Sequence, residues 1–230
     1  MSRIFGPVIQ QGYVVPNMRE ATKHWIEIGI GPFYVDEHLK LPGLYFGKQY
    51  EFELSPAFTY SGDQQIELIQ PHGDAPSIYK DYLKRVPEGG LQHIAVWAEE
   101  PDDVVKTLKA EGRRFEVTQS YIDITRTNRN RHVYLDSIDH PGTMVQLMMH
   151  DPLYIKLFGM IKHAADTWDG SDPIRPIGVL LEGLLAGTGA DWKHGDGDGG
   201  RGRQSQAGVR ARSHGQGGPG SGGAGADHHA

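Results

Sequence analysis

Four polar residues of this chain stand in runs that are otherwise apolar, and together they have the chemistry of a metal site. Gln10 lies in the run VIQQGYVV, and His93 lies in the run LQHIAV. Glu67 and Gln146 lie in the short runs IELI and VQLM. Alternation along a strand puts each of them on the face opposite its immediate neighbours. Since a buried polar group is costly unless it is satisfied, and imidazole, carboxylate and amide oxygen all bind divalent metals, the pattern points to a metal.

The spacing of these residues indicates an internal duplication. Gln10 and His93 are 93 − 10 = 83 residues apart, and Glu67 and Gln146 are 146 − 67 = 79 apart. A nearly constant offset is the sequence signature of a repeat. Two halves paired about a pseudo-twofold axis would bring all four residues to one centre. The alternative is that each side chain only hydrogen-bonds to its neighbours at a strand end; four matching positions favour the metal.

Both halves show the same predicted order of elements, which is strand, helix and three strands. Asn17 is the expected N-cap of the first helix, and Pro42-Gly43 is expected to form a turn. The first half has predicted strands at 8–15, 33–39, 50–60 and 64–70, and a helix at 18–28. The second half has predicted strands at 91–98, 115–122, 131–135 and 143–149, and a helix at 101–110. We therefore predict an α+β fold of two paired βαβββ modules, at about 5–72 and 90–150.

Two segments follow the second module. Residues 151–177 carry apolar residues in helical order, which predicts an appended helix. This helix would either cap the site or pack on a partner subunit, and we expect the packing. Residues 178–230 hold 17 of the 31 glycines, a composition that buries too little apolar surface to offset the entropy of ordering. We predict a disordered tail there.

The overall composition excludes several classes of protein. Lys and Arg number 23 against 29 Asp and Glu, for a net charge of -6, which argues against a nucleic-acid partner. No apolar run approaches the roughly 18 residues of a membrane span. Cysteine is absent, so disulfides and thiolate chemistry are excluded. Residues 1–5 do not read as a signal peptide, and cytoplasmic residence is the expectation.

Several motifs resemble those of the vicinal-oxygen-chelate superfamily, which includes glyoxalases, bleomycin-resistance proteins and dioxygenases. Gln10–Pro16 resembles its first strand and Gln65–Ile69 its fourth. Gly90–Ala95 is similar to the Gly-Leu-His-His segment of methylmalonyl-CoA epimerases, with Gln92 in place of the first His. His140–Leu147 resembles the closing strand. The resemblance covers about 5–150 and lies nearest to the epimerase and glyoxalase branch.

The resemblance implies a divalent metal (Zn, Ni, Co, Mn or Fe) held by Gln10, Glu67, His93 and Gln146. In this superfamily the metal holds two adjacent oxygens of a small-molecule substrate. The chain departs from the pattern at Gln146, where the family usually has Glu, because an amide cannot act as a base. Glu67, Glu51 and Glu53 are then the candidate catalytic carboxylates, and Glu51 falls near the second proton-transferring carboxylate of the epimerases. A solvated strand face is the alternative for Glu51 and Glu53.

Two groups of residues are candidates for binding the substrate. Arg126, Arg129 and Arg131 cluster at an expected turn, and arginine binds carboxylate or phosphate in a bidentate manner. They would hold an anionic substrate or a CoA phosphate, or else form an exposed basic loop. Six aromatic residues would line the cavity or belong to the core: Tyr13, Phe58, Tyr60, Trp97, Tyr121 and Tyr134.

The resulting prediction is a metal-dependent isomerase or lyase that abstracts a proton next to a carbonyl of a carboxylate or thioester, such as an acyl-CoA. A homodimer is compatible with the resemblance. The first alternative is a non-catalytic, drug-sequestering binding protein, which gains weight from Gln146. The second is an iron-dependent dioxygenase, which would need two His and one Glu where this chain has Gln10, His93 and Gln146.

Overall fold

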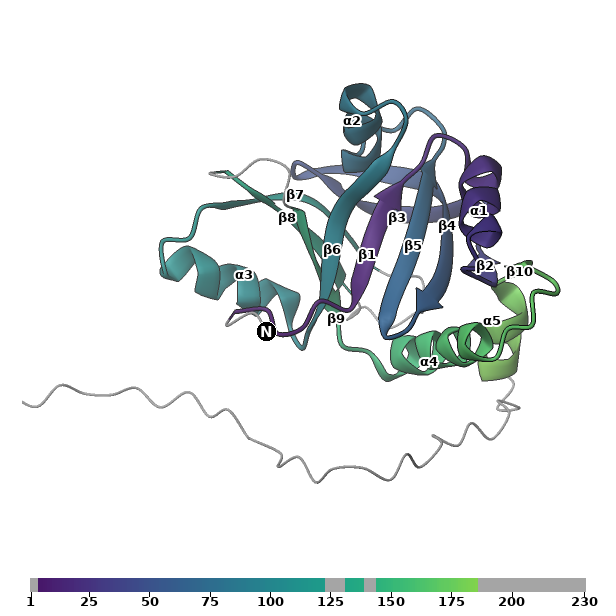
Figure 1. The fold of residues 1–230 in the computed structure, drawn as a ribbon. Coiled ribbons are helices and arrows are strands. Elements are labelled where there is room, and N and C mark those ends of the chain that lie inside the picture. Colours follow the sequence, from purple (N-terminus) through teal and green to yellow (C-terminus); the bar gives the residue numbers. More distant parts are fainter. Residues whose placement is uncertain (1–3, 123–130, 139–143, 186–230) are drawn as a thin grey trace, which may run out of the picture. The chain divides into compact units, whose positions relative to one another are not determined.

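In the computed structural model, strands from both halves of the chain close into a barrel, and the fold is α+β as predicted (Figure 1). The structure describes residues 4–122, 131–138 and 144–185. The barrel strands follow the order β4-β3-β7-β8-β9-β6-β1-β5, and pairing of β5 with β4 completes the circle. β2 and β10 extend the sheet outside the barrel from β4.

The two modules contain the predicted elements with shifted boundaries, and the first has one further strand, β3, that was not predicted. The first comprises β1 (Gln10–Val14), α1 (Met18–Glu27), β2 (Phe33–Val35), β3 (Leu39–Tyr45), β4 (Lys48–Ser61) and β5 (Gln64–Pro71). The second comprises β6 (Gly90–Ala98), α3 (Pro101–Ala110), β7 (Phe115–Ile122), β8 (Arg131–Ser137) and β9 (Met144–Met149). Helix α2 (Ile78–Arg85) joins them, and α4 (Pro152–Asp166), β10 (Ile174–Pro176) and α5 (Gly178–Leu185) follow.

The pairing of the strands carries the internal duplication. β1 lies parallel to β5, the last strand of its own module, and β6 likewise lies parallel to β9. The two first strands, β1 and β6, pair with each other in antiparallel fashion and join the modules. Figure 1 shows β1 between β5 and β6, so the first and last strands of both modules meet in one half of the barrel.

The predicted turn at Pro42-Gly43 is wrong, because β3 continues through both residues. The chain turns instead at Phe46 and Gly47, which have positive φ values of 45° and 75°. Gly43 pairs with Tyr121 of β7, and a Cβ at Gly43 would lie 2.5 Å from the carbonyl oxygen of Ser120. The glycine therefore permits the close approach of β7 that closes the barrel, rather than a turn.

The helices cover the barrel with the apolar faces that the sequence indicated. Asn17 caps α1 by accepting a hydrogen bond from the Glu20 backbone N–H, as predicted. Trp25 of α1 packs over the first module, and Leu108 of α3 packs over the second. None of the helices within the described ranges is long and apolar enough to cross a membrane.

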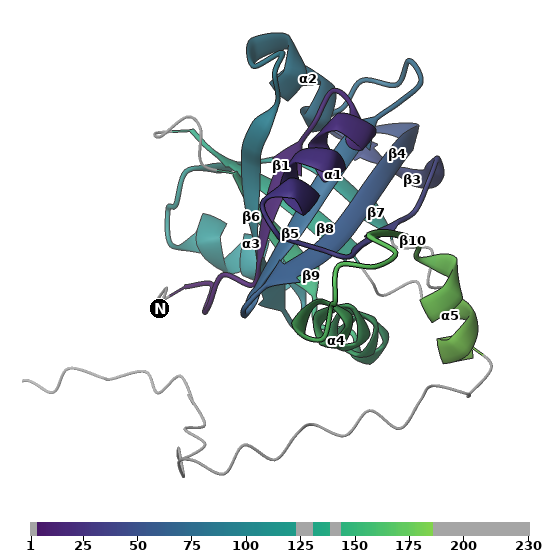
Figure 2. The same ribbon diagram turned by 45° about the vertical axis from the view of Figure 1, so that its right-hand side comes forward.

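The appended segment belongs to the barrel domain of its own chain. Helix α4 lies against the barrel strands in Figure 2, and it buries Leu157, Phe158 and Ile161 within its own chain. The apolar face that the sequence assigned to a partner subunit is therefore covered by the barrel. The tail predicted from residue 178 begins instead with α5, whose Leu180 and Leu181 pack on the same cluster. A short apolar run, VLLEGLL, lies at the start of the Gly-rich segment and forms this helix, although the composition of the whole segment predicted no helix. Residues 186–230 of the predicted tail lie outside the described ranges.

Replacement of Ile161 with alanine tests whether α4 is part of this domain. Ile161 is fully buried, so we expect Ile161→Ala to lower the free energy of unfolding by about 2–5 kcal/mol. Ile155→Ala on the same helix is the matched control, because Ile155 is 40% exposed. Urea denaturation followed by circular dichroism measures both. Equal small losses would contradict the placement of α4.

Candidate functional site

The four candidate ligands lie on two neighbouring rows across the barrel strands. In one row, Gly12 of β1 pairs with Glu67 on one side and with His93 on the other. In the next row, Gln10 pairs with Ala95, and Ala95 pairs with Gln146. Residues i and i+2 of a strand share a face, so all four side chains lie on the same side of the sheet. The structure thus brings together residues that are up to 136 positions apart in the chain, 146 − 10.

All four side chains are buried, and each has one polar atom without a hydrogen-bond partner. Their exposed fractions are 0% for Gln10, 6% for Glu67, 2% for His93 and 1% for Gln146. Six buried side-chain atoms lack a partner in the described part of the chain, and four of them are Gln10 Oε1, Glu67 Oε2, His93 Nε2 and Gln146 Oε1. Every one is an atom that coordinates divalent metals. Unsatisfied buried polar atoms are costly, which makes this concentration informative.

The imidazole of His93 presents the nitrogen that a metal requires. His93 Nδ1 lies 2.7 Å from Gln92 Oε1, while Gln92 Nε2 donates to Met144 Sδ at 3.2 Å. A thioether only accepts, so the Gln92 oxygen faces His93 and Nδ1–H is the donor. Nε2 of neutral His93 then carries the lone pair. It lies 3.5 Å from Glu67 Oε2, too far for either atom to satisfy the other.

The side-chain amides of Gln10 and Gln146 use their nitrogens in hydrogen bonds, while their oxygens have no hydrogen-bond partner. Gln10 Nε2 donates to Gln65 Oε1 at 2.7 Å. Gln146 Nε2 lies 2.9 Å from both His132 Nδ1 and the Tyr134 hydroxyl. Each carbonyl oxygen is therefore available to a cation. These residues fit a divalent metal through two amide oxygens, one carboxylate and one imidazole; within residues that the structure describes, there is no cluster of three or more His, Cys, Asp or Glu suited to a metal.

Gly12 makes room for His93. A Cβ at this position would lie 2.0 Å from Cε1 of the His93 ring, so any side chain here would displace the imidazole. We expect Gly12→Ala to lower the free energy of unfolding by about 1–3 kcal/mol, as overpacking of a core does, and to lower bound metal. Gly178→Ala is the control, because nothing lies within 4 Å of a Cβ there. Thermal melts and elemental analysis report the two effects; an unaltered Gly12→Ala protein would contradict this geometry.

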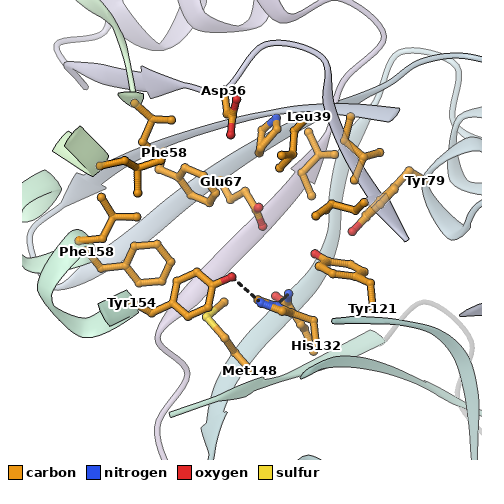
Figure 3. A pocket seen from close by; sticks show the side chains of 18 residues that line it. Asp36, Leu39, Phe58, Glu67, Tyr79, Tyr121, His132, Met148, Tyr154 and Phe158 are labelled. Carbon is orange, nitrogen blue, oxygen red and sulfur yellow. Dashed lines mark hydrogen bonds between the residues drawn. The ribbon is translucent and has the colours of Figure 1, made fainter. Parts of the chain in front are cut away.

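A cavity of about 110 Å³ opens beside the four residues (Figure 3). Glu67 and Gln146 line it directly, whereas Gln10 and His93 are not part of its lining. Its other polar residues are Asp36, Tyr79, Tyr121, His132 and Tyr154. Its apolar residues are Leu39, Leu41, Leu54, Pro56, Phe58, Ile69, Met148, Leu157, Phe158, Ile177 and Leu181. The carboxylate of Glu67 points toward the middle of this space in Figure 3.

The structure does not bring Glu51 and Glu53 to this cavity. Leu54, Pro56 and Phe58 of β4 line it, and alternation places the odd-numbered residues 51 and 53 on the opposite face. The Glu51 side chain is 68% exposed and lies 4.0 Å from Lys40 Nζ. Glu53 lies 2.7 Å from His38 Nδ1, and that hydrogen bond lowers the pKa of Glu53.

Four polar residues of the cavity were not among the candidates from the sequence: Asp36, Tyr79, His132 and Tyr154. Asp36 follows β2, and burial raises the pKa of its carboxyl above the ordinary value. His132 and Tyr154 are joined at 3.0 Å between Nε2 and the hydroxyl oxygen. Only His132 left a signal, since it lies two residues before Tyr134 on a strand and so shares its face. Nothing local to Asp36 or Tyr154 marks them, because their neighbours in the cavity are distant in sequence.

The remaining candidates are distributed as follows. Phe58 and Tyr121 line the cavity, which is one of the two places that the sequence left open for them. Tyr60 accepts a hydrogen bond from Gln65, and Trp97 packs against Phe158; neither is among the lining residues. Tyr13 packs on Trp25 outside the cavity, and Tyr134 is fully buried within the network around Gln146. Arg126 and Arg129 lie outside the described residues, and Arg131 begins β8.

Comparison with known proteins agrees with this architecture. The chain matches the model of the Glyoxalase/Bleomycin resistance protein/Dioxygenase superfamily over residues 9–134. It is 36% identical over 66 residues to the mitochondrial methylmalonyl-CoA epimerase of Dictyostelium discoideum, a match that spans 29% of this chain and 39% of that protein.

Solved structures with a similar fold include the methylmalonyl-CoA epimerase of Mycobacterium tuberculosis. Its TM-score is 0.48 at 14% identity, covering 67% of this chain and 95% of that one. A hypothetical protein from Bacillus halodurans C-125 has a TM-score of 0.46 at 14% identity, covering 63% and 94%. Because the superfamily model covers more than half of its residues, the chain belongs to the Glyoxalase/Bleomycin resistance protein/Dioxygenase superfamily.

Proposed function

We propose that this protein is a metal-dependent isomerase or lyase that removes a proton next to a carbonyl of a carboxylate or thioester substrate. One observation carries the proposal: four metal-donor atoms, on four buried side chains of one barrel face, have no hydrogen-bond partner among the residues that the structure describes. The adjoining cavity gives a substrate access to Glu67 and Gln146. The similarity to an epimerase over 66 residues supports the same class of reaction.

The ligands are Gln10, Glu67, His93 and Gln146, and Gln92 keeps His93 in the tautomer that binds. A divalent metal bound there supplies electrostatic stabilisation of the negative charge that develops on the substrate oxygens. The network of Tyr134 and His132 holds the Gln146 amide so that its oxygen stays oriented. These residues bind the metal and orient its ligands. Neither of the two amides, Gln10 and Gln146, can take up the proton.

Asp36 is the carboxyl that accepts the proton in this proposal. Among the described residues, two carboxyl groups line the cavity, those of Asp36 and Glu67, and Glu67 belongs to the ligand set. Partial burial raises the pKa of Asp36, which makes its ionised form a stronger base than an exposed aspartate. Glu51 and Glu53, on the outer face of β4, do not take this role.

The proposal is tested by metal content and by proton exchange. Purified protein is analysed by elemental mass spectrometry, as isolated and after incubation with Zn, Ni, Co, Mn or Fe(II). Exchange of the α-proton of CoA thioesters is then followed by NMR in D₂O. We expect roughly one metal per chain and exchange that requires it. A folded protein that binds none of these metals would contradict the proposed mechanism.

A non-catalytic binding protein is the second candidate, and two observations favour it. Gln146 has no basic group, and the cavity lining is mainly apolar, as in sites that sequester small molecules. Tight binding of apolar compounds, with no exchange of the α-proton in the presence of any of these metals, would establish a binding protein. Cytoplasmic residence and a homodimer remain predictions, to be checked by cell fractionation and by light scattering.

A further inference from the structure

The side of the cavity formed by β4 and the C-terminal elements is a mainly apolar wall, in which the Tyr154 hydroxyl is paired with His132. Phe58 of β4 packs on Phe158 of α4 with ring centroids 5.7 Å apart. Leu157, Ile177 and Leu181 belong to the same hydrophobic cluster and also line the cavity. Such a surface gains free energy by covering an apolar group of a ligand and has nothing to offer a charged one.

The apolar wall has no cationic side chain beside it that could bind an anionic group. Among the residues that the structure describes, no Lys or Arg lines the cavity. A carboxylate bound against the wall would lose its hydration and would find no cationic side chain in its place. The lining therefore favours a neutral occupant for the part of the cavity next to α4.

The apolar wall is built largely by the segment that follows the barrel. The elements α4, β10 and α5 begin at Pro152, beyond the superfamily match, which ends at residue 134. This segment adds Leu157, Phe158, Ile177 and Leu181 to the lining. The C-terminal extension thus changes what the cavity accepts, while the ligand set stays in the barrel strands.

We propose that the substrate carries a neutral, apolar group of about one ring in size on its reacting carbon, and that α4 and α5 recognise this group. The inference rests on the proposed function and names the substrate class of the same site. The size follows from the cavity volume of about 110 Å³, a little less than the ~150 Å³ of an apolar cavity that binds benzene. The two adjacent oxygens of the substrate remain at the Glu67 and Gln146 end.

Three CoA thioesters that differ only at the reacting carbon test this. Mandeloyl-CoA carries a phenyl ring beside a hydroxyl, lactoyl-CoA carries a methyl group in place of the ring, and methylmalonyl-CoA carries a carboxylate. Dissociation constants are measured by calorimetry on the metal-loaded protein. We expect mandeloyl-CoA to bind about tenfold or more tightly than lactoyl-CoA, and methylmalonyl-CoA to bind less tightly than mandeloyl-CoA.

A cavity-filling variant shows whether α5 provides the preference. Leu181→Trp fills the wall, and we expect it to weaken mandeloyl-CoA binding about tenfold while changing lactoyl-CoA binding less than threefold. Val179→Trp on the same helix is the matched control, because Val179 is 55% exposed. Leu181→Phe, a smaller filling change at the same position of α5, takes its place with the same expected direction if Leu181→Trp does not fold. Equal effects on both thioesters would overturn the assignment of α5.

The two proposals fail in different ways. Mandeloyl-CoA that binds most tightly but exchanges no α-proton in D₂O would overturn the proposed function and support the substrate class. Tighter binding of lactoyl-CoA or methylmalonyl-CoA, with α-proton exchange, would overturn the substrate class and leave the function standing. Tightest binding and exchange of mandeloyl-CoA supports both.

Discussion

Bound metal is expected to disappear when Glu67 and His93 are both replaced with alanine, and α-proton exchange with it. The change removes two of the four partnerless donor atoms, and two amide oxygens alone bind a transition metal weakly. We expect the metal content to fall from about one per chain to near zero and exchange to fall more than about 100-fold, since loss of outer partners alone costs 10–100-fold. Elemental mass spectrometry and NMR exchange measure the two quantities.

The chain offers a matched control for that double variant. Glu53 and His72 are another Glu and His held near each other, on the outer face of the barrel beside His38. Glu53→Ala with His72→Ala should leave the metal content and exchange unchanged. Circular dichroism establishes that both double variants fold. Metal retained in the folded Glu67 and His93 variant would place the site elsewhere.

Replacing Asp36 with asparagine is expected to slow α-proton exchange by about 10²–10⁴-fold, the usual contribution of a general base. Metal content should not change, because Asp36 is not in the ligand set. The comparison is with Glu51→Gln, the carboxyl that sequence position favoured and that lies on the outer face of β4. A large loss in Glu51→Gln and none in Asp36→Asn would reverse this assignment.

The pH dependence follows from the direction of the Asp36 shift. A base works when it is ionised, so exchange in the wild type should fall as the pH drops through the pKa of Asp36. Burial raises that pKa above its ordinary value of 3.8, so the acid limb lies at a higher pH than an exposed aspartate would give. If the pH profile of exchange keeps the same acid limb in Asp36→Asn, a group other than Asp36 is responsible for that limb.

The same shift makes Asp36 a cost to stability at neutral pH. A carboxyl whose pKa is higher in the folded than in the unfolded chain binds protons more tightly when folded. Protonated Asp36 favours the folded chain fully at pH values below its pKa in the unfolded chain. This contribution is lost as the pH rises through its pKa in the folded chain. Asp36→Asn should therefore melt at a higher temperature than the wild type at pH 7, a trade of stability for function seen at many active sites.

Alternation and the repeat were enough to predict the four candidate ligands and the barrel strands other than β3, in which a turn was expected. Gln10 and His93 each stand in an apolar run, and the offsets of 83 and 79 residues mark equivalent strands. Both signals are local or periodic, so they survive without knowledge of the fold. Pairing of β1 with β5 and β6 then places the residues on one face, as the repeat implied.

The cavity itself was decided by tertiary structure. Alternation shows that Glu51 and Glu53 share a face, but only the curvature of the closed sheet decides that this face is outside. Asp36 reaches the cavity because β2 pairs with β4 outside the barrel and leads the chain back to its wall. The C-terminal helices line the same cavity, although local composition could not distinguish a helix that caps the site from one that binds a partner subunit. Which face of a strand is inside, and which helix covers it, depend on contacts between residues distant in sequence, and no local pattern contains them.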